Sequence, residues 1–134
     1  MDAEFVYAQG QFDVVKRPIA KPDYSKYDEI PMTEQPMNSF VDICNENEGA
    51  AILNTGLKAY ESDDDYNHTV YLSLLRCFEL RIYVTPEEQN YSRIENGSQS
   101  FGEHTFRYAF MPHKGDWEDA QAVSYTHLTL PTTE

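Results

Sequence analysis

The sequence lacks the short motifs that mark phosphate-binding and nucleophilic enzymes. Its six glycines are scattered singly, so no G-x-G-x-x-G or Walker phosphate loop can be drawn. It contains no G-x-S-x-G, and neither Cys44 nor Cys77 lies in a C-x-x-C pair. Two cysteines do not make a disulfide framework. Each falls at the end of a strand-like run, where we expect a buried free thiol.

Basic residues are also scarce. Ten Lys and Arg stand against 23 Asp and Glu, which gives a formal net charge of −13. So acidic a surface repels phosphate backbones, and we expect no nucleic-acid partner. No run is long and apolar enough to span a bilayer, so we expect no membrane partner. The first residues form no basic-then-apolar leader, and the sequence leaves the compartment open.

Metal-ligand spacing is missing as well. The sequence has no H-E-x-x-H or H-x-H, and the run at 63–65 lacks the spaced ligands of a calcium loop. We therefore expect no metal or cofactor in this chain. Paired carboxylates, by contrast, are too numerous in this sequence to identify a catalytic pair. Glycoside hydrolysis needs two of them ~5 to 10 Å apart, and a chain with 23 acidic residues always offers some pair.

What the sequence does contain is a series of short aromatic and aliphatic runs. Ten Tyr and seven Phe suit half-buried pleated surfaces. No segment keeps a helical apolar period, and Gly or Pro separates the runs, which predicts an antiparallel β-sandwich. Strands are expected at 4–8 and 11–16, paired as a hairpin around Gly10, and at 39–44 and 50–54, paired as a second hairpin through the turn at 45–49. Further strands are expected at 68–77, with a continuation or repeat at 80–84, and at 103–111. The strand at 68–77 is apolar on both faces and should be central, and Pro112 should end the last one.

Three polar stretches are expected between the strands. Residues 17–38 hold four prolines and should form a surface loop that carries Tyr24 and Tyr27. Residues 61–67 contain three consecutive aspartates and should be a solvated turn. Residues 85–100 should form a long polar loop.

The most distinctive stretch is GEHTFRYAFMPHKGDW at 102–117. Two histidines, an arginine, an aspartate and a tryptophan converge there as candidates for a substrate cleft or a domain interface: His104, Arg107, His113, Asp116 and Trp117. The structural alternatives place His104 on the aromatic face of the strand, let His113 cap the turn and make Trp117 a plug over the core. No residue in the stretch is assigned a catalytic role.

Aromatic rings can also cover the apolar faces of sugars, while polar side chains bind the hydroxyls. Trp117 fits that chemistry, as do the loop tyrosines Tyr24, Tyr27 and Tyr91. Arg107 faces away from the aromatic stripe of its strand, which makes it a candidate for a salt bridge between domains.

Several segments in order resemble the C-terminal β-domain of glycoside hydrolase family 38, the α-mannosidases. They are FDVVKRP at 12–18, PMNSFVD at 36–42, EGAAILNTGL at 48–57, TVYLSLLR at 69–76 and PHKGDW at 112–117. Order and spacing agree over residues 4–122. The chain differs in having Phe40 where tryptophan is common, and in lacking the strands that normally follow residue 120. An exposed sheet edge and some unburied core are expected from that difference.

The resemblance implies a fragment of a bacterial retaining α-mannosidase that acts on mannose-containing carbohydrate. In that family an upstream α/β domain carries a zinc ion, held by His and Asp, and an aspartate nucleophile. None of those motifs is present here, so the implied partner is an upstream catalytic domain of the same polypeptide. The fragment is expected to be inactive by itself and to support or shape the substrate cleft.

Two other functions remain open. The chain could be a stand-alone, non-catalytic carbohydrate-binding sandwich, or a purely structural interface domain of the same enzyme. The expected division is a partial β-domain at 1–122 and a non-native tail at 123–134, VSYTHLTLPTTE, which resembles translated adapter sequence. A genuine edge strand at 125–130 is the alternative for the tail.

Overall fold

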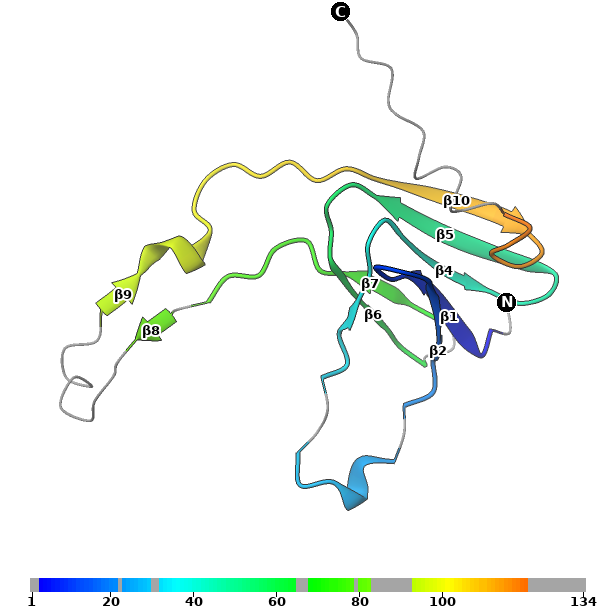
Figure 1. Cartoon of the computed structure of the whole chain (residues 1–134), viewed down its shortest axis with the longest axis horizontal. Helices are drawn as coiled ribbons and strands as arrows, with labels where there is room; N and C mark the ends of the chain where they lie inside the picture. Colours follow the sequence, from blue (N-terminus) through cyan, green and yellow to red (C-terminus); the bar gives the residue numbers. More distant parts are fainter. Residues whose placement is uncertain are drawn as a thin grey trace, which may run out of the picture. The chain divides into compact units, whose positions relative to one another are not determined.

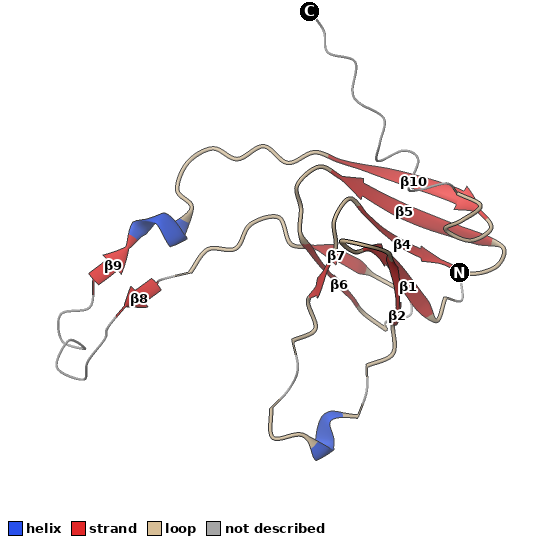
Figure 2. Ribbon diagram, in the orientation of Figure 1, coloured by secondary structure: helices blue, strands red, loops and turns tan. Residues whose placement is uncertain are grey.

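The computed structural model describes residues 3–21, 23–29, 32–64, 68–78, 80–82 and 93–120. The chain divides into two compact units, one of residues 1–73 with 106–134 and one of residues 74–105. Regular structure is almost entirely β-strand (Figure 2). In the described part of the chain, no helix is long and apolar enough to cross a membrane. The expected tail at 123–134 lies outside the described residues.

The larger unit contains a five-stranded antiparallel sheet with strand order β10-β5-β4-β1-β2 (Figure 1). Its strands are β1 (Phe5–Gln9), β2 (Val14–Pro18), β4 (Phe40–Cys44), β5 (Glu48–Asn54) and β10 (Tyr108–Lys114). The β1–β2 and β4–β5 hairpins confirm two pairings predicted from the sequence. The second hairpin is closed by the Asn45 side chain, which accepts hydrogen bonds from the amides of Asn47 and Glu48.

A smaller antiparallel sheet has the order β3-β6-β7. It consists of β3 (Gln35–Pro36), β6 (Ala59–Ser62) and β7 (Val70–Leu72). Residues from both sheets share one hydrophobic core, in which Val6 and Tyr60 are fully buried and Val41 nearly so. Successive strand side chains point to opposite faces, so every second residue of β1 and β4 enters this core. The result is the antiparallel β-sandwich predicted from the sequence.

The opposite face of the larger sheet carries a second, smaller core. Phe40 and Ala51 are fully buried there, and the Trp117 ring packs against them. The ring lies 6.5 Å from the Phe40 ring, centroid to centroid, and 6.1 Å from the Tyr7 ring. The chain reaches this position through Gly115, whose φ of 72° lies in the left-handed region that favours glycine. The turn after β10 therefore folds back over the sheet.

The strand predicted at 68–77 is present but shorter, and its predicted central position is wrong. Strand β7 covers only Val70–Leu72 and lies at the edge of its sheet. Its last ladder contact is made by Ser73, whose N–H donates to the Ala59 carbonyl oxygen at 3.1 Å. Leu74 and Leu75 beyond it are 43% and 47% exposed. β7 is thus an edge strand although its sequence is apolar on both faces, because burial depends on neighbouring strands that the local sequence does not reveal.

The last strand is displaced from its predicted position at 103–111. Strand β10 begins at Tyr108 and runs through Pro112 to Lys114, so the proline does not end the ladder. β10 is an edge strand, and there a proline can lie without depriving a neighbouring strand of a hydrogen bond. Tyr108 and Phe110 are 60% and 68% exposed, which matches the expectation of an exposed apolar edge.

The predicted polar segments are partly structured. Of the loop expected at 17–38, Arg17 and Pro18 belong to β2, and the described residues after them include a 3-10 turn, η1 (Tyr24–Lys26), and the short edge strand β3. The turn expected at 61–67 begins inside β6. In the smaller unit, β8 (Leu80–Ile82) pairs with β9 (Arg93–Glu95), which is followed by η3 (Asn96–Gln99). The loop expected at 85–100 is therefore wrong over 93–99, and its first part lies outside the described residues.

Candidate functional site

A buried aspartate–histidine pair, joined by a hydrogen bond, lies beneath the turn that carries Trp117. The Asp42 side chain on β4 is completely buried, and its Oδ2 lies 2.8 Å from Nε2 of His113 on β10. The His113 side chain is only 7% exposed. The expectation that His113 caps the turn is therefore wrong, because the ring points into the sheet face and not toward the turn. In the tautomer with a proton on Nε2, the ring donates this hydrogen bond to Asp42.

Gly49 makes the pair possible. It lies on β5, between β4 and β10, and pairs with Cys44 on one side and His113 on the other. A methyl group at Gly49 would lie 2.4 Å from His113 Cε1 and 2.4 Å from Cys44 Cβ. The imidazole thus crosses β5 over a position without a side chain to reach a carboxylate two strands away. Sequence reasoning did not assign a role to Asp42 or Gly49, although an aspartate inside the apolar run SFVDIC signals a buried partner.

Burial shapes the chemistry of this cluster. It raises the pKa of the Asp42 carboxyl, and the neighbouring His113 opposes that rise. Burial together with the Asp42 charge raises the pKa of the Cys44 thiol to about 12. A thiol with so high a pKa is protonated and a poor nucleophile at neutral pH. Cys44 is therefore an unreactive thiol beside a buried aspartate–histidine pair.

The two cysteines should differ sharply in reactivity. Cys44 is buried, as expected, whereas Cys77 is exposed, so the expectation of a buried thiol there is wrong. We expect Ellman's reagent to modify one thiol in the native chain and both after unfolding in guanidinium chloride. The variant Cys77→Ser should lose almost all of the native signal. Rapid native reaction of the variant would contradict the burial of Cys44.

Asp116 and Trp117 are brought close to His113 by the turn after β10. Oδ1 of Asp116 accepts hydrogen bonds from the amides of Glu118 and Asp119, at 2.9 and 3.0 Å. It caps the final turn, which carries the Trp117 ring onto Phe40. The packing of Trp117 matches the alternative in which it closes the core. Three of the five candidates are thus gathered on one face of the larger sheet.

His104 and Arg107 have different surroundings. Nε2 of His104 lies 2.7 Å from the carbonyl oxygen of Ser100 within the smaller unit, and the side chain is exposed. The packing of His104 on the aromatic face stays a prediction. The Arg107 side chain is exposed in the larger unit, and its backbone carbonyl accepts a hydrogen bond from Thr55. Exposure leaves the Arg107 guanidinium available for the domain salt bridge predicted from the sequence, which stays a prediction.

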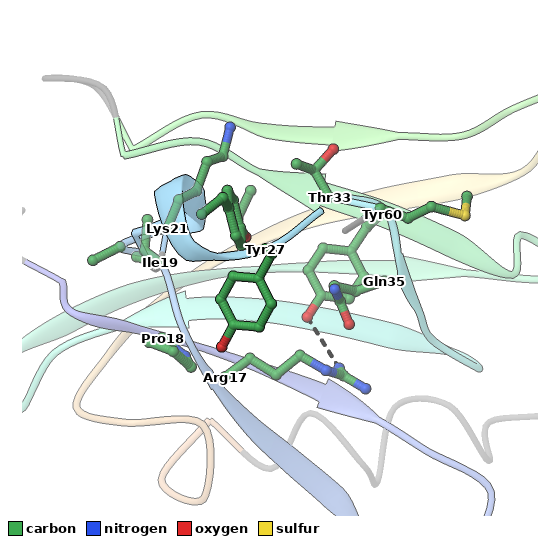
Figure 3. Close-up of a pocket in the computed structure, with 12 residues that line it drawn as sticks. Arg17, Pro18, Ile19, Lys21, Tyr27, Thr33, Gln35 and Tyr60 are labelled. Atoms are coloured by element: carbon green, nitrogen blue, oxygen red, sulfur yellow. Dashed lines mark hydrogen bonds between the residues drawn. The ribbon is translucent and has the colours of Figure 1, made fainter. Parts of the chain in front are cut away.

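The larger unit also contains a pocket of about 340 Å³ near the start of the proline-rich loop (Figure 3). Sequence reasoning singled out its loop tyrosines but missed the residues that the fold brings to them, and Tyr91 lies outside the described residues. Strand β2 supplies Arg17, β3 supplies Gln35 and β6 supplies Tyr60. Nη1 of Arg17 donates a hydrogen bond to the Tyr60 hydroxyl at 3.1 Å. No local signal links these three residues, because 43 positions separate Arg17 from Tyr60.

Catalytic groups do not converge in the described part of the chain. No three His, Cys, Asp or Glu side chains come together there as a metal site. The pocket is lined by aromatic, hydroxyl, amide and cationic groups, and none of its lining residues is Asp or Glu. Such a pocket can bind a small ligand, but it does not present the carboxylate pair of a glycosidase.

Comparisons with known proteins agree on one family. The model of the glycosyl hydrolases family 38 C-terminal domain matches residues 1–80. An α-mannosidase from Enterococcus faecalis has a similar structure, with a TM-score of 0.71 and 28% identity. A glycosyl hydrolase family 38 protein from the same species gives a TM-score of 0.63 and 28% identity. Each alignment covers 94% of this chain but 13% of the solved one. No curated protein matches the chain.

Proposed function

Because the chain belongs to the family of glycosyl hydrolase family 38 C-terminal domains, we propose that it is the non-catalytic β-domain segment of a retaining α-mannosidase. Its role is to support or shape the substrate cleft of a catalytic domain that lies upstream in the same polypeptide. The substrates of the whole enzyme are glycans or oligosaccharides with α-mannosidic linkages.

One observation carries the proposal. The sandwich matches an α-mannosidase structure over 94% of its own length, and that match accounts for 13% of the larger protein. A segment of this size can hold a β-domain but not the α/β catalytic domain that the resemblance implies. The zinc ion and the aspartate nucleophile are accordingly proposed for the upstream domain. The described residues offer no three-ligand metal cluster, so no step of the reaction is assigned to this chain.

The direct test is an assay of the purified chain with an aryl α-mannoside, with and without added zinc. We expect no turnover above the rate in buffer, since a glycosidase needs two placed carboxyl groups. A tandem protein in which the chain is joined to its upstream sequence should turn the substrate over. Measurable hydrolysis by the chain alone, removed by an active-site inhibitor, would overturn the non-catalytic assignment.

A further inference from the structure

The pocket beside the proline-rich loop has the construction of a small-ligand site. Its volume of about 340 Å³ lies at the lower end of the range for ligand pockets, which suits a single ring better than an extended chain. The buried side chains of Tyr60 and Ile19, 0% and 2% exposed, form a rigid floor. Tyr27 forms part of the wall, and it is 64% exposed. An exposed aromatic wall over a packed floor is a surface on which a ring can stack.

Polar groups converge on the same space. The Arg17 guanidinium has five N–H donors, and its hydrogen bond to Tyr60 uses one of them. In Figure 3 the hydroxyls of Tyr27 and Tyr60 both point toward the Arg17 side of the pocket. The Gln35 amide, which can donate and accept, lines the pocket as well. Tyr60 is fully buried. The groups left for a ligand are therefore the remaining Arg17 donors, the Tyr27 hydroxyl and the Gln35 amide, which together can satisfy several hydroxyl groups of one ligand.

The charges around the pocket favour a neutral ring over an anionic one. Lys21 also lines the pocket, but its Nζ is 2.9 Å from Asp63 and 3.8 Å from Glu61, so two carboxylates already balance it. Arg17 makes no ion pair with a carboxylate in the described part of the chain. An anionic ligand would be attracted by the Arg17 guanidinium but repelled by the rest of the chain, whose net charge is −13. A neutral, polyhydroxylated ring makes the same hydrogen bonds without that repulsion.

We propose that this pocket, formed by Arg17, Gln35, Tyr60 and the Tyr27 wall, is a binding site for one neutral pyranose ring of a carbohydrate. The ring stacks on Tyr27. Its hydroxyl groups accept hydrogen bonds from the Arg17 guanidinium, and they both donate hydrogen bonds to the Gln35 amide and accept them from it. The site stands on the pocket alone. If the pocket binds no sugar, the proposed role of the chain in a larger enzyme is unaffected. If that role is disproved, the proposed sugar site is likewise unaffected.

The test is a titration of the ¹⁵N-labelled chain with methyl α-D-mannopyranoside, followed by amide chemical shifts. We expect saturable shifts around residues 17–35 and 60–62, with a dissociation constant of about 1 to 10 mM, typical of a small ligand that makes few contacts. Tyr27→Ala should weaken binding at least about fivefold. Tyr108→Ala is the matched control, because Tyr108 is similarly exposed, at 60% against 64%, but lies on β10 and does not line the pocket. It should leave binding unchanged.

Arg17→Lys separates hydrogen bonding from charge, because it keeps the cation and removes the planar fork of donors. It should also weaken binding about fivefold, and an unchanged thermal midpoint shows that the variant is folded. Glucuronate and inorganic phosphate test the claim of a neutral ligand. Tighter binding of either anion than of the mannoside would overturn it. So would the absence of shifts at 50 mM mannoside, or an equal loss of binding in Tyr108→Ala.

Discussion

Replacing Gly49 with alanine is expected to lower the free energy of unfolding by about 3 kcal/mol, at the upper end for overpacking of a core. The added methyl group would lie 2.4 Å from both His113 Cε1 and Cys44 Cβ, a separation that real atoms do not adopt. The imidazole must move and lose its contact with Asp42. The Cys44 Cβ is fixed to its backbone, so the second clash can be relieved only by a shift of β4 relative to β5. Chemical denaturation, with the midpoint and slope compared between variant and wild type, measures the loss.

Gly10→Ala is the control for this substitution. Its nearest neighbours would be Asp13 O at 3.1 Å and a Val15 methyl at 3.4 Å, both in an exposed turn. The cost should stay below about 1 kcal/mol, because the turn can relax. A Gly49→Ala variant as stable as Gly10→Ala would show that the imidazole does not cross β5 at this position.

Removing the imidazole is the second substitution with a large expected effect. His113→Ala should cost about 3 kcal/mol, because it leaves the Asp42 carboxylate buried without its partner. His104→Ala is the matched control, since it removes an exposed histidine and its hydrogen bond to the Ser100 carbonyl, and it should change stability by less than about 1 kcal/mol. Equal stability of the two variants would contradict the buried pair.

The pair also predicts how stability depends on pH. Burial raises the pKa of Asp42 above its unfolded value of about 3.9, so the folded state binds this proton more tightly than the unfolded state. The contribution of Asp42 to stability is therefore full below about pH 3.9 and is lost as pH rises through the folded pKa. Asp42→Asn cannot titrate. The difference in unfolding free energy between wild type and Asp42→Asn should shift in favour of the wild type on acidification, and the opposite slope would contradict the raised pKa.

The sequence predicts the sandwich more successfully than the surroundings of individual side chains. The hairpins around Gly10 and after Cys44 follow from local signals, namely alternating apolar residues and turn-forming Gly, Asn and Asp. The extent of β7 and β10 does not, because it depends on whether a neighbouring strand is present. Pro112 illustrates this, since a proline ends a central strand but is accepted on the edge strand β10.

The candidate residues show the same limit. Sequence proximity places His113, Asp116 and Trp117 in one short run, and the structure gathers them on one face of the larger sheet. The partner of His113, however, is 71 positions away, and only the strand register through Gly49 brings the two together. The pocket is similar, since Tyr60 belongs to a strand that the sequence did not predict. Long-range pairing therefore determines both sites, and local patterns do not encode it.

We propose that this chain is the non-catalytic β-domain of a larger family 38 enzyme. Sequencing the DNA that precedes the Met1 codon tests it most directly. We expect an open reading frame that continues upstream in phase and encodes an α/β domain with the zinc-binding His and Asp residues and the aspartate nucleophile. An in-frame stop codon followed by a ribosome-binding site immediately before Met1 would contradict the claim, and would favour the stand-alone carbohydrate-binding sandwich instead.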